Sequence, residues 1–195
     1  MRIEICGGIG AGKSTLANLI NHNEITAVLE NFKANPFWEP FYSNPSKYIF
    51  ETEVTFLLQH YHAIKVASEQ IDNFICDFSF YQDLAYAKMG LENAQLKIFN
   101  EIFTEGLNDV GQPDLLICLQ CDSTTLKNRI DSRGRKEEQS INYMFLDSLN
   151  KYIYEDVSNF PSSKVLYINS KENNFASDSS TQRKIVNLIK DRVSI

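Results

Sequence analysis

The residues from Gly7 to Ser14 read Gly-Gly-Ile-Gly-Ala-Gly-Lys-Ser and match the pattern G-x-x-x-x-G-K-S/T in full. Glycines let backbone N–H groups close around phosphate oxygens, because no Cβ stands in the way. Lys13 offers a point charge to the outer phosphates, and Ser14 offers a hydroxyl to Mg²⁺. The pattern predicts a phosphate loop that binds a nucleoside triphosphate, which we expect to be ATP. The expected binding residues are Gly7, Gly8, Ile9, Gly10, Ala11, Gly12, Lys13, Ser14 and Thr15.

Classes of phosphate-loop protein differ in what accompanies the loop. A switch GTPase carries a guanine-reading N-K-x-D sequence, which does not occur here, and a large ATPase machine needs more than 195 residues. A small kinase needs the loop, a substrate pocket and a mobile arginine-bearing lid that neutralises charge on the transferred phosphoryl group. The sequence therefore favours phosphoryl transfer to a small molecule.

Three arginines in the second half of the chain could form such a lid. Arg129 and Arg133 are four residues apart, so a helix would place them on one face, and Gly134 permits a bend before Arg135. We expect all three to be catalytic, on a lid at about residues 129–139.

Short apolar runs alternate with longer helical segments, which predicts a parallel sheet with helices on both faces. The expected strands are Arg2–Cys6, Ile25–Leu29, Phe74–Asp77, Leu115–Gln120 and Val165–Ile168. The expected helices lie near residues 13–21, 46–70, 80–109, 123–132, 140–158 and 180–193. Two stretches, Asn31–Asn44 and Asn169–Ser180, are expected as loops because they contain prolines or are rich in Ser and Asn. The predicted fold is α/β: one P-loop NTPase domain over residues 1–195, with a five-stranded parallel sheet flanked by helices.

The composition argues against a nucleic-acid partner, a membrane segment and a zinc site. Nineteen Lys and Arg against 25 Asp and Glu give a net charge of -6, which argues against a nucleic-acid polymer as the main partner. There is no apolar run of about 18 residues and no leader before the loop, so we expect a cytoplasmic protein without a membrane segment. Cys118 and Cys121 form a single C-x-x-C with no second pair to complete a zinc site, so buried thiols are expected.

The order of several further motifs resembles the deoxynucleoside kinase family. Members of that family carry a Glu after the second strand, then N-P, then F-Y-x-D/N-P before a long helix. This chain has Glu30, then Asn35-Pro36, then Phe41-Tyr42-Ser43-Asn44-Pro45. Asp77-Phe-Ser-Phe-Tyr-Gln-Asp83 is similar to the family's D/E-R-S-x-Y-x-D, and Arg133-Gly-Arg-Lys-Glu-Glu138 is similar to its R-x-R-x-E-E lid.

The resemblance implies a role for each matching residue. Glu30 would be the general base that takes the proton of the sugar 5′-hydroxyl, and Tyr42 and Glu138 would bind the 3′-hydroxyl. Asp77 would hold or orient Mg²⁺ together with Ser14. The resemblance also implies a homodimer, formed by helices around residues 48–66 and 81–103.

The substrate pocket departs from the family pattern. Phe78 replaces an arginine, Glu53 replaces the glutamine that reads the nucleobase, and His60 replaces a second arginine. Asp83, which pairs with those arginines in the family, is kept. Two aromatic positions that enclose the base align with Thr52 and Ala87. We expect His60 to recover part of the lost positive charge by protonation beside Glu53 or Asp83.

These changes suggest a purine-leaning substrate. An ionised carboxylate at Glu53 only accepts hydrogen bonds, which would favour the donors of guanine, and Ala87 would leave room for a purine. The expected substrate-binding set is Glu30, Tyr42, Glu53, His60, Phe78, Asp83 and Glu138. The leading hypothesis is transfer of the γ-phosphate of ATP to the 5′-hydroxyl of a (deoxy)nucleoside. Alternatives are a nucleoside monophosphate kinase of the thymidylate kinase type and a non-catalytic nucleotide-binding protein of the same fold.

Overall fold

The computed structural model of the chain describes residues 1–21 and 24–193, and its centre is a five-stranded sheet. The strands are β1 (Arg2–Gly7), β2 (Thr26–Val28), β3 (Phe74–Cys76), β4 (Leu115–Gln120) and β5 (Val165–Asn169). They lie in the order β2-β3-β1-β4-β5, and every neighbouring pair is parallel. The predicted α/β class and parallel sheet are confirmed.

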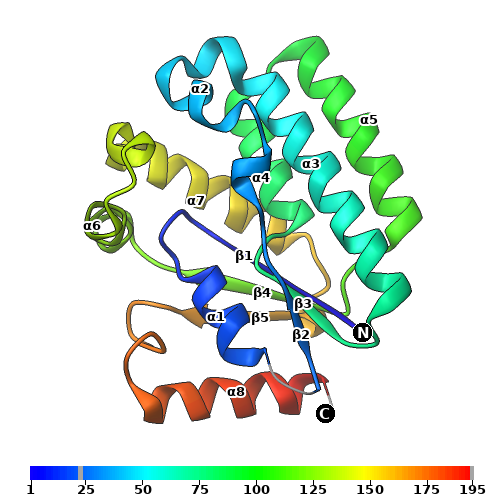
Figure 1. Cartoon of the computed structure of the whole chain (residues 1–195), viewed down its shortest axis with the longest axis vertical. Helices are drawn as coiled ribbons and strands as arrows, with labels where there is room; N and C mark the ends of the chain where they lie inside the picture. The colour runs from blue at the N-terminus through cyan, green and yellow to red at the C-terminus, as the bar shows by residue number, and fades with distance from the viewer. Residues whose placement is uncertain (22–23, 194–195) are drawn as a thin grey trace.

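Helices cover both faces of the sheet (Figure 1). On one side lie α1 (Lys13–Ile20) and α8 (Ser179–Val193), and on the other lie α3 (Pro45–Gln70), α4 (Phe80–Gly90), α5 (Asn93–Val110) and α7 (Tyr143–Ser158). Alternate residues of β1 serve the two sides, as expected for a buried parallel strand. Ile3 and Ile5 pack in the core that contains Leu16 and Ile189, whereas Cys6 packs in the core that contains residues of α7.

Two segments differ from the sequence prediction. The stretch 31–44 is not simply a loop, because it contains a short 3₁₀ helix η1 (Phe32–Ala34) and helix α2 (Trp38–Ser43). The stretch 80–109 is two helices, since α4 ends at Gly90 and α5 begins at Asn93. At Gly90 the chain meets α3 so closely that a Cβ would lie 1.8 Å from Cδ1 of Ile49, and Leu91 then leaves the helix in an extended conformation.

The remaining helices lie between β4 and β5. Helix α6 (Ser123–Arg133) begins after Asp122, whose side chain accepts a hydrogen bond from the Thr125 N–H, and ends at Gly134 with φ 70°. Two 3₁₀ helices follow at η2 (Glu137–Ser140) and η3 (Ser162–Lys164). The predicted loop after β5 is present between Asn169 and Ser179.

The parallel order decides where a site can form. The carboxyl ends of all five strands open on one edge of the sheet, which is where ligands bind in open α/β folds. The phosphate loop follows β1, Glu30 follows β2, Asp77 follows β3 and Ser170 follows β5.

All four cysteines are buried and free, as predicted. Over residues 1–21 and 24–193, no helix combines the length and apolar character needed to cross a membrane.

Candidate active site

The phosphate loop has a conformation that depends on glycine. Gly10 has φ 81° and Gly12 has φ 102°, both in the left-handed region that L side chains rarely adopt. The Lys13 ammonium donates to the carbonyl oxygen of Gly7 at 2.9 Å and of Gly8 at 3.3 Å, so it lies within the curve of the loop. Helix α1 begins at Lys13, and its free N–H groups face the same point. A loop of this shape can hold the phosphates of a nucleoside triphosphate.

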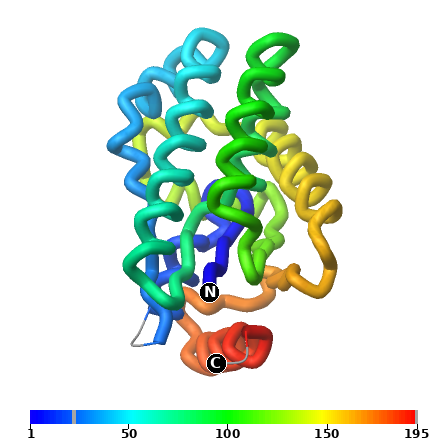
Figure 2. The backbone as a smooth tube through the Cα atoms, turned by 90° about the vertical axis from the view of Figure 1, so that its right-hand side faces the viewer, coloured from blue at the N-terminus to red at the C-terminus, as the bar shows by residue number. Residues whose placement is uncertain are grey.

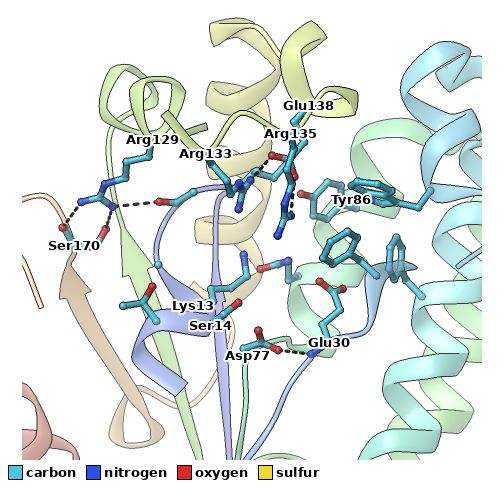
Figure 3. A pocket seen from close by; sticks show the side chains of 18 of the residues that line it. Lys13, Ser14, Glu30, Asp77, Tyr86, Arg129, Arg133, Arg135, Glu138 and Ser170 are labelled. Carbon is cyan, nitrogen blue, oxygen red and sulfur yellow. Dashed lines mark hydrogen bonds and ion pairs between the residues drawn. The ribbon is translucent and has the colours of Figure 1, made fainter. Parts of the chain in front are cut away.

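A cavity of about 530 Å³ extends from this loop toward α2, α3 and α4. Figure 3 shows Lys13, Glu30, Arg133 and Arg135 directed into it from different elements. Among the sequence-predicted site residues, the structure brings the following to its lining: Ile9, Gly10, Gly12, Lys13, Ser14, Thr15, Glu30, Tyr42, Glu53, Asp77, Asp83, Arg129, Arg133, Arg135 and Glu138. Donor and acceptor positions can therefore share one enclosed space.

Glu30 is fixed from two sides at the centre of this cavity. Its backbone N–H donates to Oδ1 of Asp77, and its Oε1 lies 3.0 Å from Nε2 of His60. The side chain keeps 29% of its surface exposed. Burial raises the pKa of Glu30, but the hydrogen bond and charge of His60, with Lys13 and Arg135, bring it below the usual value. Glu30 is therefore an ionised carboxylate at neutral pH.

The three arginines of the expected lid differ in their contacts. Arg129 links the phosphate loop to the segment after β5, through bonds to Gly10 O at 3.3 Å and Ser170 O at 2.7 Å. Arg133 and Arg135 both bind the buried carboxylate of Glu138, the latter at 3.0 Å, as the dashed lines in Figure 3 mark. About a third of each of these two side chains is exposed. The result is one arginine attached to the loop and two held beside it.

The acceptor end of the cavity is lined by Tyr42, Glu53, Phe56 and Tyr86. Glu53 is 4% exposed, and burial together with the charges of Asp83 and Glu30 raises its pKa well above the usual value, against the opposing charge of His60. These effects favour the neutral form of the carboxyl group, which has one donor and one acceptor. The raised pKa runs against the expectation of an ionised Glu53 that only accepts.

Three residues of the predicted pocket are buried and do not line the cavity: His60, Phe78 and Ala87. His60 is 3% exposed, and its ring stacks on Phe78 with centroids 4.1 Å apart and planes 7° apart. Ala87 is fully buried in the core with Leu57, so it leaves no room for a base, and that expectation was wrong. Tyr86, one residue earlier, lines the cavity instead. Thr52, the other position aligned with an enclosing aromatic, does line the cavity, and its hydroxyl donates to the Tyr48 carbonyl at 2.7 Å.

The structure adds residues that sequence reasoning missed. Gln82 lies at the loop, where its Oε1 accepts from the Gly7 N–H at 3.2 Å. Tyr86 follows Gln82 by four residues on α4, a spacing that could have placed it on the same face. Phe175 lines the donor end and lies close to Gly12, where an added Cβ would be 3.2 Å from its ring. It lies in an irregular segment with no periodic signal.

Comparisons with known proteins identify the family of this chain. The model of the deoxynucleoside kinase family matches residues 3–194. The chain belongs to the deoxynucleoside kinase family. As a member of this family, the protein is an ATP-dependent nucleoside kinase. The family assignment therefore does not support the two alternatives, a monophosphate kinase and a non-catalytic nucleotide-binding protein.

Individual relatives agree with this family assignment. A deoxyguanosine kinase of Bacillus subtilis (strain 168) is 30% identical over 152 residues, covering 75% of this chain and 73% of that protein. A deoxyadenosine kinase of Lactobacillus acidophilus is 28% identical, covering 98% and 95%. A solved structure of deoxyadenosine kinase from M. mycoides with bound dCTP has a TM-score of 0.80 at 24% identity, covering 100% of this chain and 99% of that chain. That last likeness shows the shared fold.

Proposed function

We propose that this deoxynucleoside kinase transfers the γ-phosphate of ATP to the 5′-hydroxyl of a purine deoxynucleoside. The observation that carries the proposal is the single cavity shared by the phosphate loop and the ionised carboxylate of Glu30. Glu30 takes the hydroxyl proton as the 5′-oxygen bonds to the γ-phosphorus and the bond to the departing ADP breaks. Lys13, Arg129, Arg133 and Arg135 are the cations available to the negative charge on the phosphates.

We further propose that Mg²⁺ is held on the triphosphate by Ser14 and Asp77. Both side chains line the cavity, and hydroxyl and carboxylate oxygens are ligands that Mg²⁺ accepts. In the described residues no group of three or more His, Cys, Asp or Glu side chains could hold a metal, which fits an ion carried mainly by phosphates and water. Bound there, Mg²⁺ would neutralise charge on the phosphates.

The residues at the acceptor end support binding of the sugar and the base of a nucleoside. Tyr42 and Glu138 are the proposed partners of the 3′-hydroxyl. Burial and the nearby charge of Glu138 raise the pKa of Tyr42, so its hydroxyl stays protonated and can donate. In its neutral form Glu53 offers one donor and one acceptor, which can pair with the edge of a base but match purines and pyrimidines alike. The purine class is proposed because the relatives include a deoxyguanosine kinase and a deoxyadenosine kinase.

A panel of the four deoxynucleosides with ATP tests the function, with deoxyadenosine and deoxyguanosine expected to give the highest kcat/KM. Replacing Glu53 by leucine removes the base's hydrogen-bond partners, so kcat/KM for purines should fall about 10–100-fold. Glu53→Gln keeps one donor and one acceptor and should retain purine turnover. Glu51→Leu, an exposed position on the same helix, is the matched control. Pyrimidine preference would contradict the purine assignment, and a normal Glu53→Leu enzyme would contradict base recognition by Glu53.

We propose a homodimer through α3 and α5, which lie side by side along one side of the molecule (Figure 2). Tyr61 and Lys65 of α3 bind Asp109 of α5 at 2.6 and 2.8 Å. Leu58 on α3 and Ile98 on α5 are 49% and 45% exposed, which supports a partner on this side. Light scattering should give the dimer mass, and Leu58→Glu should halve it. Leu188→Glu on α8, a site with 45% exposure, should not. A wild-type monomer would contradict the proposal.

Residues 1–195 are proposed as one domain in which segment 129–139 closes over the bound triphosphate. The partial exposure of Arg133 and Arg135, and their attachment to Glu138 of the same segment, support a unit that can move together.

We also propose a cytoplasmic location, because four free thiols fit a reducing compartment.

A further inference from the structure

His60 joins two carboxylates that come from separate elements. Its Nδ1 lies 2.8 Å from Oδ2 of Asp83, in the first turn of α4, and its Nε2 lies 3.0 Å from Oε1 of Glu30, after β2. The His60 side chain is 4% exposed and that of Asp83 is 5% exposed. The buried His60 ring therefore connects two carboxylates that both line the cavity.

The hydrogen-bond pattern determines the charge of the ring. An ionised carboxylate can only accept hydrogen bonds, so each ring nitrogen that faces one must carry a proton. A neutral imidazole would turn a lone pair toward one of the two carboxylates, in a site with little water to separate them. With both carboxylates ionised, the arrangement requires an imidazolium between Asp83 and Glu30.

Two aromatic rings keep the imidazolium in place. Phe78 is nearly parallel to it at 4.1 Å, and Phe56, one turn earlier on α3, lies 5.9 Å away at 26°. Aromatic faces attract cations, most strongly where water is excluded. The ring therefore has partners on its two nitrogens and on its flat sides, and it cannot turn without losing them.

These contacts orient the Glu30 carboxylate. One carboxylate oxygen is bound by His60, and its backbone N–H is bound by Asp77, so the carboxylate is oriented from within the protein. We propose that His60 is a positioning residue, an imidazolium anchored on Asp83 that holds Glu30 so that its free oxygen can accept the proton of the nucleoside 5′-hydroxyl. This inference rests on the proposed function of Glu30 as the base, and it assigns His60 no contact with substrate.

The surrounding charges support a protonated ring. Burial lowers the pKa of His60, but the charge and hydrogen bond of Asp83 and the hydrogen bond and charge of Glu30 outweigh it and raise the pKa to about 10. Burial raises the pKa of Asp83 itself, and the charge and hydrogen bond of His60 oppose that rise. Glu53, also on α3, acts on the same group, and Lys13 and Arg135 lower the pKa of Glu30. Because the pKa of the folded state lies above neutrality, the ring stays charged at pH 7 and loses its proton only as the pH rises toward 10.

Kinetics of three variants test the positioning role. His60→Gln should lower kcat about 10²-fold, as expected for a misplaced reacting group, with the KM values for ATP and nucleoside within about threefold of wild type. Asp83→Asn should lower kcat less, and the double variant should be no slower than His60→Gln, since the residues act as one unit. His62→Gln, at an exposed position on the same helix, is the control. A raised nucleoside KM with normal kcat, or additive losses, would overturn the proposal.

Nitrogen NMR of the histidine rings in the whole protein gives a readout independent of turnover. At pH 7.5 the His60 ring should have both nitrogens protonated. Its signals are assigned by their absence in His60→Gln or, if that variant does not fold, by their change in Asp83→Asn. In Asp83→Asn the ring should lose its proton at a lower pH than in wild type. A neutral ring at pH 7.5 would overturn the inference. If wild type phosphorylates no nucleoside, the function of Glu30 fails while the ring charge is still decided.

Discussion

Replacing Glu30 by glutamine should lower kcat for nucleoside phosphorylation about 10²–10⁴-fold, the range expected for loss of a general base. The change keeps the size of the side chain, and its amide oxygen can still accept from Nε2 of His60. It removes the negative charge and, with it, the ability to take a proton from the 5′-hydroxyl. The KM for ATP should stay near the wild-type value, because the loop residues are unchanged.

The expected loss can be separated from a general effect of charge. Glu39→Gln makes the same substitution at an exposed position on α2, and this variant should turn over normally. Steady-state kinetics of both variants, with the melting temperature as a check on folding, measure the difference. A Glu30→Gln enzyme within threefold of wild-type kcat would show that the hydroxyl proton leaves by another route.

The phosphate loop could be read from the sequence because its chemistry is local. Glycine spacing, Lys13 and Ser14 lie within eight residues, and the backbone angles of Gly10 and Gly12 are those that only glycine adopts readily. The sheet was predictable for a similar reason, since apolar runs and helical segments alternate along the chain. The order of the strands, by contrast, depends on crossovers between distant segments.

The pocket was harder to predict because tertiary contacts decide it. Motif alignment assigned Ala87 to the base, but one residue of helix turns a side chain by about 100°, and Tyr86 is the one that lines the cavity. The break falls at Gly90, where Ile49 of α3 leaves no room for a Cβ, a tertiary contact that no local pattern records. His60 was expected beside Glu53 or Asp83, and its bond to Glu30 could not be foreseen, since it joins α3 to the segment after β2.

The chemistry of Glu53 shows why residue type alone is insufficient. A glutamate in water is an anion and a pure acceptor, and that assumption favoured guanine. Burial and two neighbouring carboxylates raise its pKa, which favours the neutral form, a donor as well as an acceptor. Sequence gives the group, whereas its protonation state depends on burial and on charges that folding brings together.

Replacing Lys13 by alanine should have an effect of similar size on the donor side. Its ammonium lies within the phosphate loop, bound to the carbonyl oxygens of Gly7 and Gly8. Phosphates entering the loop would meet this charge at the point where negative charge shifts during transfer. Removing it should lower kcat about 10³-fold, as for other groups that stabilise a transferring phosphoryl group.

Lys13→Arg should not restore the rate, because the planar guanidinium is wider than an ammonium and cannot occupy the same place between the two loop carbonyls. Lys47→Ala removes an exposed lysine over the Tyr48 ring and should leave kcat unchanged. The measurement is kcat with saturating nucleoside and ATP, together with binding of a non-hydrolysable ATP analogue. Weaker binding at normal kcat would mean that Lys13 holds the bound triphosphate equally before and during transfer, and it would assign charge stabilisation to the arginines instead.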